Sequence, residues 1–186
     1  MATKHLLLAL AAGVASLLAA PPAVGAKPPA VGAKPPSFSL ANLAGQPRTL
    51  SSFTGQGPVV LLVLRGFPGY QCPLCNRQVT EFVRNADAFA RAGARVVMVY
   101  PGPKNKLEVK AQEFVTGKNL PSHFELLVDP DYTFTNLYSL RWDAPNETAY
   151  PATFVLNRQG VITFAKVSDS HGGRSTATEV LAALGR

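Results

Sequence analysis

Two cysteines separated by two residues, Cys72 and Cys75, are the side chains of this chain with the most distinctive chemistry. No other cysteine occurs among its 186 residues, which excludes a disulfide-rich scaffold and a zinc site with three or four cysteine ligands. A disulfide that closes so short a loop removes little chain entropy and would be a weak structural bridge. A Cys-x-x-Cys motif near a strand–helix–strand pattern is instead typical of a redox-active dithiol.

The pair lies where a predicted strand is followed by a predicted helix. The β-branched and aliphatic run over residues 59–64 is typical of a strand buried on both faces, and glycine and proline within 65–69 then force a turn. From Pro73 the apolar residues recur with a helical period as far as Gly93, which predicts one amphipathic helix.

This position predicts that Cys72 is the more exposed of the two sulfurs and has the lower pKa. Cys72 would cap the helix, where free N–H groups and the helix dipole stabilise a thiolate and lower the pKa of the thiol. Cys75 follows one turn later on the same side, close enough for a disulfide. No acidic residue lies between Gly66 and Val79, while Arg65 and Arg77 flank the pair, which also favours the thiolate.

The rest of the chain alternates strands and helices. Further strands are predicted at 94–100, 126–128, 152–156 and 161–167, and further helices at 104–118, from 129 onward and at 176–184. This order predicts an α/β fold with a central mixed sheet covered by helices on both faces.

The first 26 residues have the pattern of a secretory signal peptide. Lys4 and His5 precede an apolar run over 6–20, and Val24 and Ala26 supply the small residues of a cleavage site. An uncleaved membrane anchor is the alternative, but the run is shorter than the roughly 20 residues that a membrane span requires. After cleavage no integral membrane segment remains, so we expect a periplasmic or secreted protein.

A proline-rich segment follows this pattern. The sequence PPAVGAK at 21–27 is repeated at 28–34, so a second equivalent cleavage site follows Ala33. Residues 27–36 have too little apolar bulk to pack, which predicts an extended tether, and 37–186 form the predicted domain. The formal net charge of +7 comes from scattered basic residues, so nucleic acid is not an expected partner, and no cofactor is predicted.

The stretch from Ser37 to Arg186 resembles the redoxin branch of the thioredoxin-fold superfamily, which includes the alkyl hydroperoxide reductase / thiol-specific antioxidant peroxiredoxins. The resemblance rests mainly on VVLLVLRGFPGYQCPLC at 59–75 and YPATFVLNRQGVITF at 150–164. Segments 37–53, 128–138 and 170–184 also match. The resemblance implies a thioredoxin-like fold and a thiol-dependent antioxidant oxidoreductase, which reduces peroxides and is regenerated by a thioredoxin-like or small-thiol reductant.

The resemblance leaves the order of attack open. Peroxiredoxins carry a Pro-x-x-x-Thr/Ser-x-x-Cys loop, which here becomes Pro68-x-x-x-Cys72-x-x-Cys75, with a cysteine at the hydroxyl position. In that register Cys75 would attack the peroxide. In the thioredoxin register Cys72 attacks and Cys75 resolves. Pro68 and Tyr70, in the turn before the cysteines, are candidate substrate contacts.

A second departure concerns the arginine that peroxiredoxins place just before a late strand. Pro151 occupies that position and matches the cis-proline beside the active site of thioredoxins, so a cis Tyr150–Pro151 bond is expected, with a trans bond as the alternative. Pro151 is thus a candidate substrate contact. Arg141 and Arg65 are the candidates to replace the missing arginine, and a surface ion pair is the alternative role for Arg141.

Two further segments have structural alternatives. Trp142, the only tryptophan, follows Arg141 and could fill a gap in the core. His171 and Arg174 lie in a polar, glycine-rich loop, for which a solvated turn is the expected role.

Three hypotheses for function follow. The first is a thiol peroxidase that passes through a sulfenic acid and a Cys72–Cys75 disulfide. The second is a thiol–disulfide oxidoreductase that acts on protein disulfides. The third is an exported copper-binding chaperone with Cys72, Cys75 and His171 as ligands. Soft thiolates suit Cu(I), but the copper proteins of the thioredoxin fold that this chain resembles usually have a wider cysteine spacing.

Overall fold

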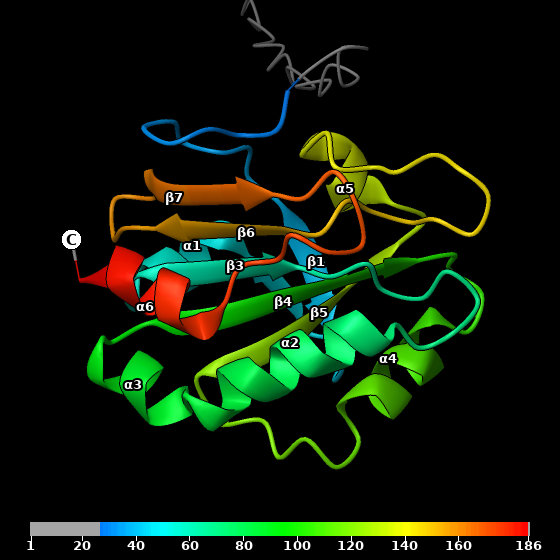
Figure 1. Cartoon of the computed structure of the whole chain (residues 1–186), viewed down its shortest axis with the longest axis horizontal. Helices are drawn as coiled ribbons and strands as arrows, with labels where there is room; N and C mark the ends of the chain where they lie inside the picture. The colour runs from blue at the N-terminus through cyan, green and yellow to red at the C-terminus, as the bar shows by residue number, and fades with distance from the viewer. Residues whose placement is uncertain (1–26, 186) are drawn as a thin grey trace, which may run out of the picture.

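The computed structural model describes residues 27–185 as one mixed β-sheet with helices packed on it (Figure 1). The strands are β1 (Ser39–Asn42), β2 (Pro47–Thr49), β3 (Val59–Val63), β4 (Arg95–Gly102), β5 (Phe124–Pro130), β6 (Ala152–Leu156) and β7 (Ile162–Val167). The helices are α1 (Leu50–Thr54), α2 (Pro73–Arg84), α3 (Ala86–Arg91), α4 (Leu107–Val115), α5 (Thr133–Leu137) and α6 (Ala177–Leu184).

The seven strands are ordered β2-β1-β5-β4-β3-β6-β7. Strands β3, β4 and β5 are parallel to one another, whereas β1, β2, β6 and β7 pair antiparallel with their neighbours. All five residues of β3 are buried, as a strand at the centre of a doubly covered sheet requires. The fold class predicted from the sequence is confirmed.

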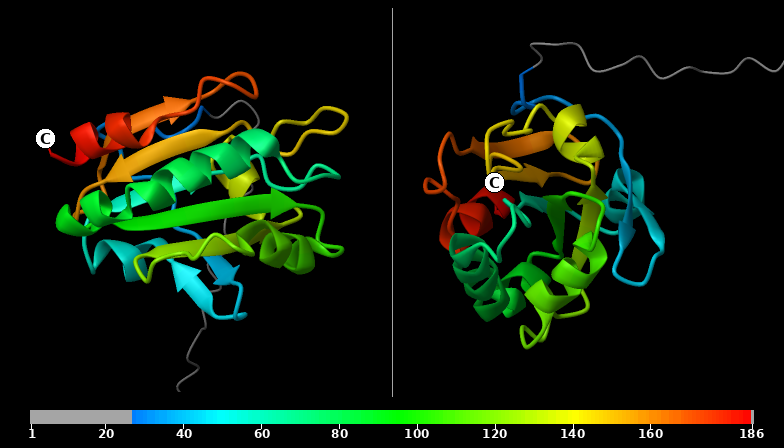
Figure 2. Two further views of the ribbon diagram at one scale, coloured as in Figure 1. Left: turned by 60° about the horizontal axis from the view of Figure 1, so that its bottom comes forward. Right: turned by 90° about the vertical axis from the view of Figure 1, so that its right-hand side faces the viewer.

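Two apolar layers hold the helices against the sheet, because successive strand residues point to opposite faces. Val60 and Leu62 of β3 face the layer that contains α2, α3, α4 and α6, and Leu61 faces the layer that contains α1 and α5. Figure 2 shows α2 and α6 lying side by side across one face. The loop from β3 to α2 therefore carries the chain from the sheet to the face covered by the first of these layers.

The amphipathic helix predicted from Pro73 is two helices in the structure, α2 and α3. Asn85 separates them, with a non-helical φ of −102° and ψ of 16°. Its side-chain amide donates to the carbonyl of Glu81, 2.9 Å away, and such local bonds compete with continuation of the helix. The apolar period continues through the break, so the sequence pattern conceals it.

The segment 27–36 contains no helix or strand, but it does not extend freely from the domain. Gly32 N–H donates to the carbonyl of Ile162 at 2.8 Å, and Ile162 N–H donates to the carbonyl of Ala33 at 2.9 Å. Backbone hydrogen bonds thus hold the expected tether against the start of β7 despite its lack of apolar bulk. The predicted signal peptide, residues 1–26, lies outside the described residues. Within residues 27–185, no helix has the length and apolar character needed to cross a membrane.

Candidate active site

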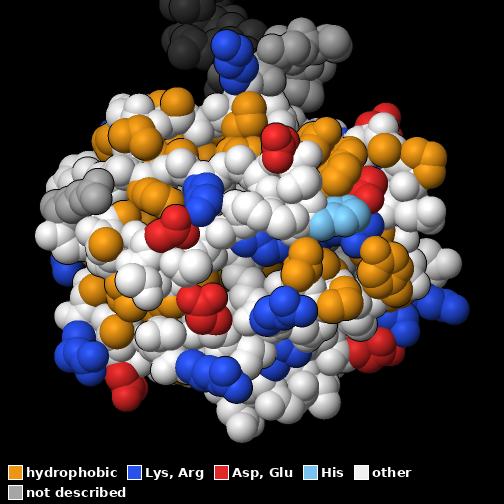
Figure 3. Space-filling model, in the orientation of Figure 1, with side chains coloured by type: hydrophobic (Ala, Val, Ile, Leu, Met, Phe, Trp, Pro, Cys, Tyr) orange, Lys and Arg blue, Asp and Glu red, His pale blue; other side chains and the backbone are white. Residues whose placement is uncertain are grey.

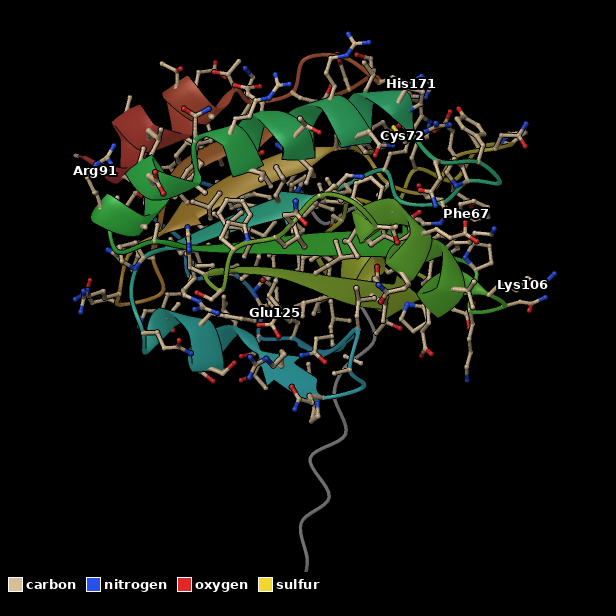
Figure 4. The ribbon with its side chains drawn as sticks, turned by 90° about the horizontal axis from the view of Figure 1, so that it is seen from below. Phe67, Cys72, Arg91, Lys106, Glu125 and His171 are labelled. Carbon is tan, nitrogen blue, oxygen red and sulfur yellow. The ribbon has the colours of Figure 1, made fainter. Side chains whose placement is uncertain are left out.

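Cys72 lies at the N-cap of α2, as the sequence predicts. Its Sγ accepts a hydrogen bond from the backbone N–H of Cys75 at 3.3 Å, and Pro73 occupies the first helical position, where a missing N–H has no cost. Both cysteines are free thiols and buried, with Cys72 3% and Cys75 0% exposed. Figure 4 shows Cys72 at the end of α2, on the same side of the molecule as His171 and far from Arg91.

The two thiols have opposite acidities. A hydrogen bond from the Cys75 thiol, the Cys75 N–H and the positive charges of Arg174 and Arg65 together lower the pKa of Cys72 to about 5, against the opposing effect of burial. Burial raises the pKa of Cys75 well above its usual range. At neutral pH the pair therefore holds one thiolate, on Cys72, with a protonated thiol beside it.

Arg174 is the arginine that contacts the sulfur. Its Nη2 lies 3.8 Å from Sγ of Cys72, its Nη1 donates to Oε1 of Gln78 at 3.1 Å, and its Nε donates to the carbonyl of His171 at 3.0 Å. The solvated turn expected for Arg174 is therefore wrong: 102 residues separate it from Cys72, and only the folded sheet and α2 bring the two together. Arg77, expected to assist the thiolate, is instead exposed.

Arg65 is the second cation near the pair, and it is 3% exposed. Its Nε donates to Oε2 of Glu147 at 2.7 Å, its Nη1 to the hydroxyl of Tyr70 at 2.6 Å, and its Nη2 to the carbonyl of Asn146 at 2.7 Å. The hydroxyl of Thr148 also donates to the backbone carbonyl of Arg65. Arg65 is thus held at both its backbone and its guanidinium, and its positive charge contributes to the lowered pKa of Cys72 without a hydrogen bond to the sulfur.

Arg141, the other arginine expected near the sulfur, holds its own loop together. Its Nη1 donates to the carbonyl of Thr148 at 2.7 Å and to the carbonyl of Trp142, and its guanidinium lies 3.9 Å from the ring centre of Tyr132. Among residues 27–185, neither cysteine contacts Arg141 through a hydrogen bond. The guanidinium is held by carbonyls of the loop 141–149, and its Nη2 lies 3.3 Å from Oδ1 of the exposed Asp143, which is the surface ion pair expected as its alternative role.

The cis bond expected at Tyr150–Pro151 is not found, because every peptide bond of residues 27–185 is trans. Trans is the lower-energy isomer even before proline, and a proline that immediately precedes a strand removes no ladder hydrogen bond. Pro151 is buried directly before β6, and its carbonyl accepts from Ser168 N–H at 2.9 Å. Pro68 is half-buried in the turn, and Tyr70 is 49% exposed. The substrate contacts assigned to Pro68, Tyr70, Pro151 and Arg141 remain predictions.

Glu147 joins the loop around Arg141 to the loop that carries Arg174. Its carboxylate binds Arg65 through one oxygen and Nε2 of His171 through the other, at 2.8 Å. Trp142 stacks on Tyr150 with ring centres 4.7 Å apart and lies 5.0 Å from the ring of His171. Trp142 is thus half-buried in an aromatic stack at the surface, and the core position expected as its alternative is not found.

The copper site of the third hypothesis is not formed. In the part of the chain that the structure describes, no group of three or more His, Cys, Asp or Glu side chains is arranged to hold a metal ion. His171 is directed to Glu147 and Trp142, so it does not complete a ligand set with the cysteines.

A groove of about 210 Å³ lies between α2 and the loop that carries Arg174. One wall is the face of α2 that carries Leu74, Arg77 and Gln78, and the other is the loop 171–176. The space-filling view shows a histidine bordered by hydrophobic and basic side chains toward the end of the molecule where α2 begins (Figure 3). Neither Gln78 nor Glu147 stands out in the sequence, because each acts through a partner more than 80 residues away.

The AhpC/TSA family model matches residues 31–165. Peroxiredoxin Q, chloroplastic, from Sedum lineare is 30% identical over 129 residues, which cover 67% of this chain and 62% of that protein. The chain thus spans less than two thirds of the length of this curated relative.

Solved structures show the same fold. Peroxidoxin BcpB from Mycobacterium tuberculosis has a TM-score of 0.66 at 24% identity, covering 83% of this chain and 95% of that one. Reduced Prx3 from Vibrio vulnificus, solved in complex with hydrogen peroxide, has a TM-score of 0.70 at 20% identity, covering 83% and 98%. The resemblance to a thioredoxin-fold redoxin, inferred from the sequence, is confirmed.

Proposed function

The chain belongs to the AhpC/TSA family, and from that premise we propose that it is a thiol peroxidase that uses Cys72 and Cys75. The observation that carries this proposal is the environment of one sulfur. Sγ of Cys72 lies 3.3 Å from the N–H of Cys75 and 3.8 Å from the guanidinium of Arg174, and the pKa of Cys72 is lowered to about 5. A thiolate is the nucleophile that attacks a peroxide O–O bond.

The proposed cycle begins when the Cys72 thiolate attacks one peroxide oxygen. An S–O bond forms, the O–O bond breaks, and the leaving alkoxide or hydroxide takes a proton to become an alcohol or water. Cys72 is then a sulfenic acid. The Cys75 sulfur attacks it, the S–O bond breaks, water leaves and a disulfide remains. Two thiols have supplied two electrons to the peroxide, and an external thiol reductant of the thioredoxin-like or small-thiol class restores them by disulfide exchange.

The contrast between the two sulfurs favours Cys72 as the attacking residue. Cys75 is fully buried, and the burial that raises the pKa of Cys75 opposes formation of its thiolate. Cys75 is suited to the second step, because its N–H and its thiol already lie against Cys72. This assignment follows the thioredoxin register of the motif.

A second candidate function rests on the same thiolate. A helix-capping cysteine with a lowered pKa, followed by a protonated partner, also suits attack on a protein disulfide through a mixed disulfide. The two candidates differ in the substrate that reaches Cys72, so a direct comparison of substrates separates them.

The test is stopped-flow oxidation of the reduced protein by hydrogen peroxide, followed by the fluorescence of Trp142, the only tryptophan. We expect oxidation much faster than that of free cysteine, no such reaction for Cys72→Ser, and a reaction that stops at a dimedone-trappable sulfenic acid for Cys75→Ser. The reverse pattern in the two variants would overturn the assignment of Cys72. A wild-type rate equal to that of free cysteine would overturn the peroxidase, and rapid turnover of insulin disulfides would then support the second candidate.

We also propose that the protein acts outside the cytosol. The support is the charged, apolar and small-residue pattern of residues 1–26, which is typical of a signal peptide. Expression of the full chain in a bacterium, followed by fractionation and N-terminal sequencing, tests it. A mature N-terminus at Lys27 or Lys34 in the exported fraction is expected, and an intact N-terminus in the cytosol would contradict the proposal.

A further inference from the structure

Gln78 is a buried amide on the inner face of α2, 5% exposed. Its Nε2 donates to the carbonyl of Ser175 at 3.0 Å, and its Oε1 accepts from Nη1 of Arg174 at 3.1 Å. A carbonyl can only accept and a guanidinium can only donate, so these partners fix the orientation of the amide. Both hydrogen bonds connect α2, which carries the cysteines, to the loop that carries Arg174.

The guanidinium of Arg174 is planar, so the position of two of its nitrogens determines the third. Its Nε is held by the carbonyl of His171 and its Nη1 by Gln78, which leaves Nη2 facing Cys72 at 3.8 Å. The first of these contacts lies within its own loop. Gln78 supplies the contact that fixes the guanidinium relative to α2.

From this geometry we propose that Gln78 is a positioning residue that holds the guanidinium of Arg174 against the sulfur of Cys72. The loop has a separate anchor, because the hydroxyls of Ser175 and Thr153 are hydrogen-bonded at 2.6 Å and Thr153 belongs to β6. Loss of the Gln78 side chain therefore leaves the loop attached to the sheet. Its main effect is that the guanidinium of Arg174 is no longer held in position.

This inference rests on the proposed role of Cys72 as the attacking thiolate, but it is tested by the acidity of Cys72 alone. Alkylation of the reduced protein by iodoacetamide is measured between pH 3 and 9, with the modified cysteine assigned by mass spectrometry. The variants are Gln78→Met, Arg174→Met and the double variant, and Gln112→Met, an exposed glutamine of α4, is the matched control. Peroxide oxidation is measured in parallel.

Arg174→Met is expected to raise the pKa of Cys72 by about one pH unit, because a nearby opposite charge is lost. Gln78→Met should raise the pKa of Cys72 by a smaller amount. The double variant should match Arg174→Met alone, because Gln78 has no effect on Cys72 once the guanidinium that it positions is absent. Gln112→Met should match the wild type. A Gln78→Met variant with the wild-type pKa, or an effect that adds in full to that of Arg174→Met, would overturn the proposal.

Gln78→Asn serves as a second variant if Gln78→Met does not fold. It keeps a buried amide but is one methylene shorter, so it cannot reach both Ser175 and Arg174, and the same rise is expected. Thermal melting checks folding throughout. Slow peroxide oxidation of the wild type together with the expected pattern of pKa changes would contradict the proposed function and support the role of Gln78. Rapid oxidation without that pattern would support the proposed function and contradict the role of Gln78.

Discussion

Arg65 and Glu147 form a largely buried ion pair, with 2.7 Å between Nε of the first and Oε2 of the second, across 82 positions of sequence. Glu147→Gln removes the negative charge and leaves the guanidinium without a charged partner. We expect the unfolding free energy to fall by about 3 kcal/mol, because the Arg65 charge then stays out of water without a negative partner. Urea unfolding of the reduced protein measures it.

The matched control for Glu147→Gln is Glu113→Gln, which removes the exposed partner of Lys110 in α4. Exposed pairs contribute little, so a change below about 1 kcal/mol is expected there. An equal fall in unfolding free energy in the two variants would mean that burial does not determine how much the Arg65–Glu147 pair stabilises the fold.

Substitutions of Arg141 and Arg65 should have different effects on the pKa of Cys72. Arg65→Met is expected to raise the pKa of Cys72, because the positive charge of Arg65 helps to lower it. Arg141→Met should leave that pKa near the wild-type value and lower the unfolding free energy by about 2 kcal/mol, since it removes charged hydrogen bonds to loop carbonyls. Alkylation profiles and urea unfolding give the two quantities. A rise in the pKa of Cys72 as large in Arg141→Met as in Arg65→Met would contradict the assignment.

The lowered pKa of Cys72 links redox state, pH and stability. A thiol whose pKa falls on folding from 9.0 to about 5 stabilises the reduced protein fully above pH 9, and this stabilisation is lost as the pH falls through about 5. The disulfide form has no such thiolate, and the loop-closure entropy that its disulfide removes from the unfolded chain does not depend on pH. The stability of the reduced form relative to the disulfide form should therefore fall by about 2 kcal/mol, or roughly 5 °C in Tm, between pH 7 and pH 4.5.

Melting curves of the reduced and oxidised protein at pH 7 and pH 4.5 check this dependence. The carboxylates of the protein titrate alike in both forms, so only the difference in Tm between the reduced and the oxidised protein is informative. A difference that stays constant between these pH values would show that the Cys72 thiolate is not the source of the stabilisation.

Gly66 and Gly69 both lie in the turn before the cysteines with positive φ, +68° and +121°, but only at Gly66 would a Cβ meet other atoms. A Cβ on Gly66 would overlap the carbonyl oxygen of Pro101, whereas a Cβ on Gly69 has no atom within 4 Å. We expect Gly66→Ala to lower unfolding free energy by about 3 kcal/mol or more, from backbone strain plus overlap. Gly69→Ala should cost about 1 to 2 kcal/mol, from strain alone. Similar losses in urea unfolding would rule out the overlap.

The parts of the fold that the sequence predicts well are those determined locally or by continuous burial. The run before the cysteines is β3, and Pro73 after Cys72 marks the start of α2, because a strand buried on both faces and a helix cap each have a distinct residue pattern. Strands β1 and β2 have no such pattern. They contain four and three residues, and β1 is held by antiparallel pairing to β5, more than 80 positions away.

The candidate site divides in the same way. The positions of Cys72 and Cys75 follow from their spacing, whereas the arginine beside them does not. In the sequence, Arg174 has the surroundings of a solvated loop; in the structure Gln78 connects that loop to α2, and the contact between Ser175 and Thr153 connects it to β6. For Arg141 the sequence does not show that its own loop folds back and supplies carbonyls for its guanidinium.

The two hydrogen bonds that join Gly32 and Ala33 to Ile162 cover part of the outer edge of the sheet. A chain that begins at Lys27 keeps this cover, whereas one that begins at Lys34 leaves the N–H and C=O of Ile162 to water. Uncovered edge strands readily pair with another chain. The choice between the two copies of PPAVGAK as the N-terminal boundary therefore also sets how prone β7 is to self-association.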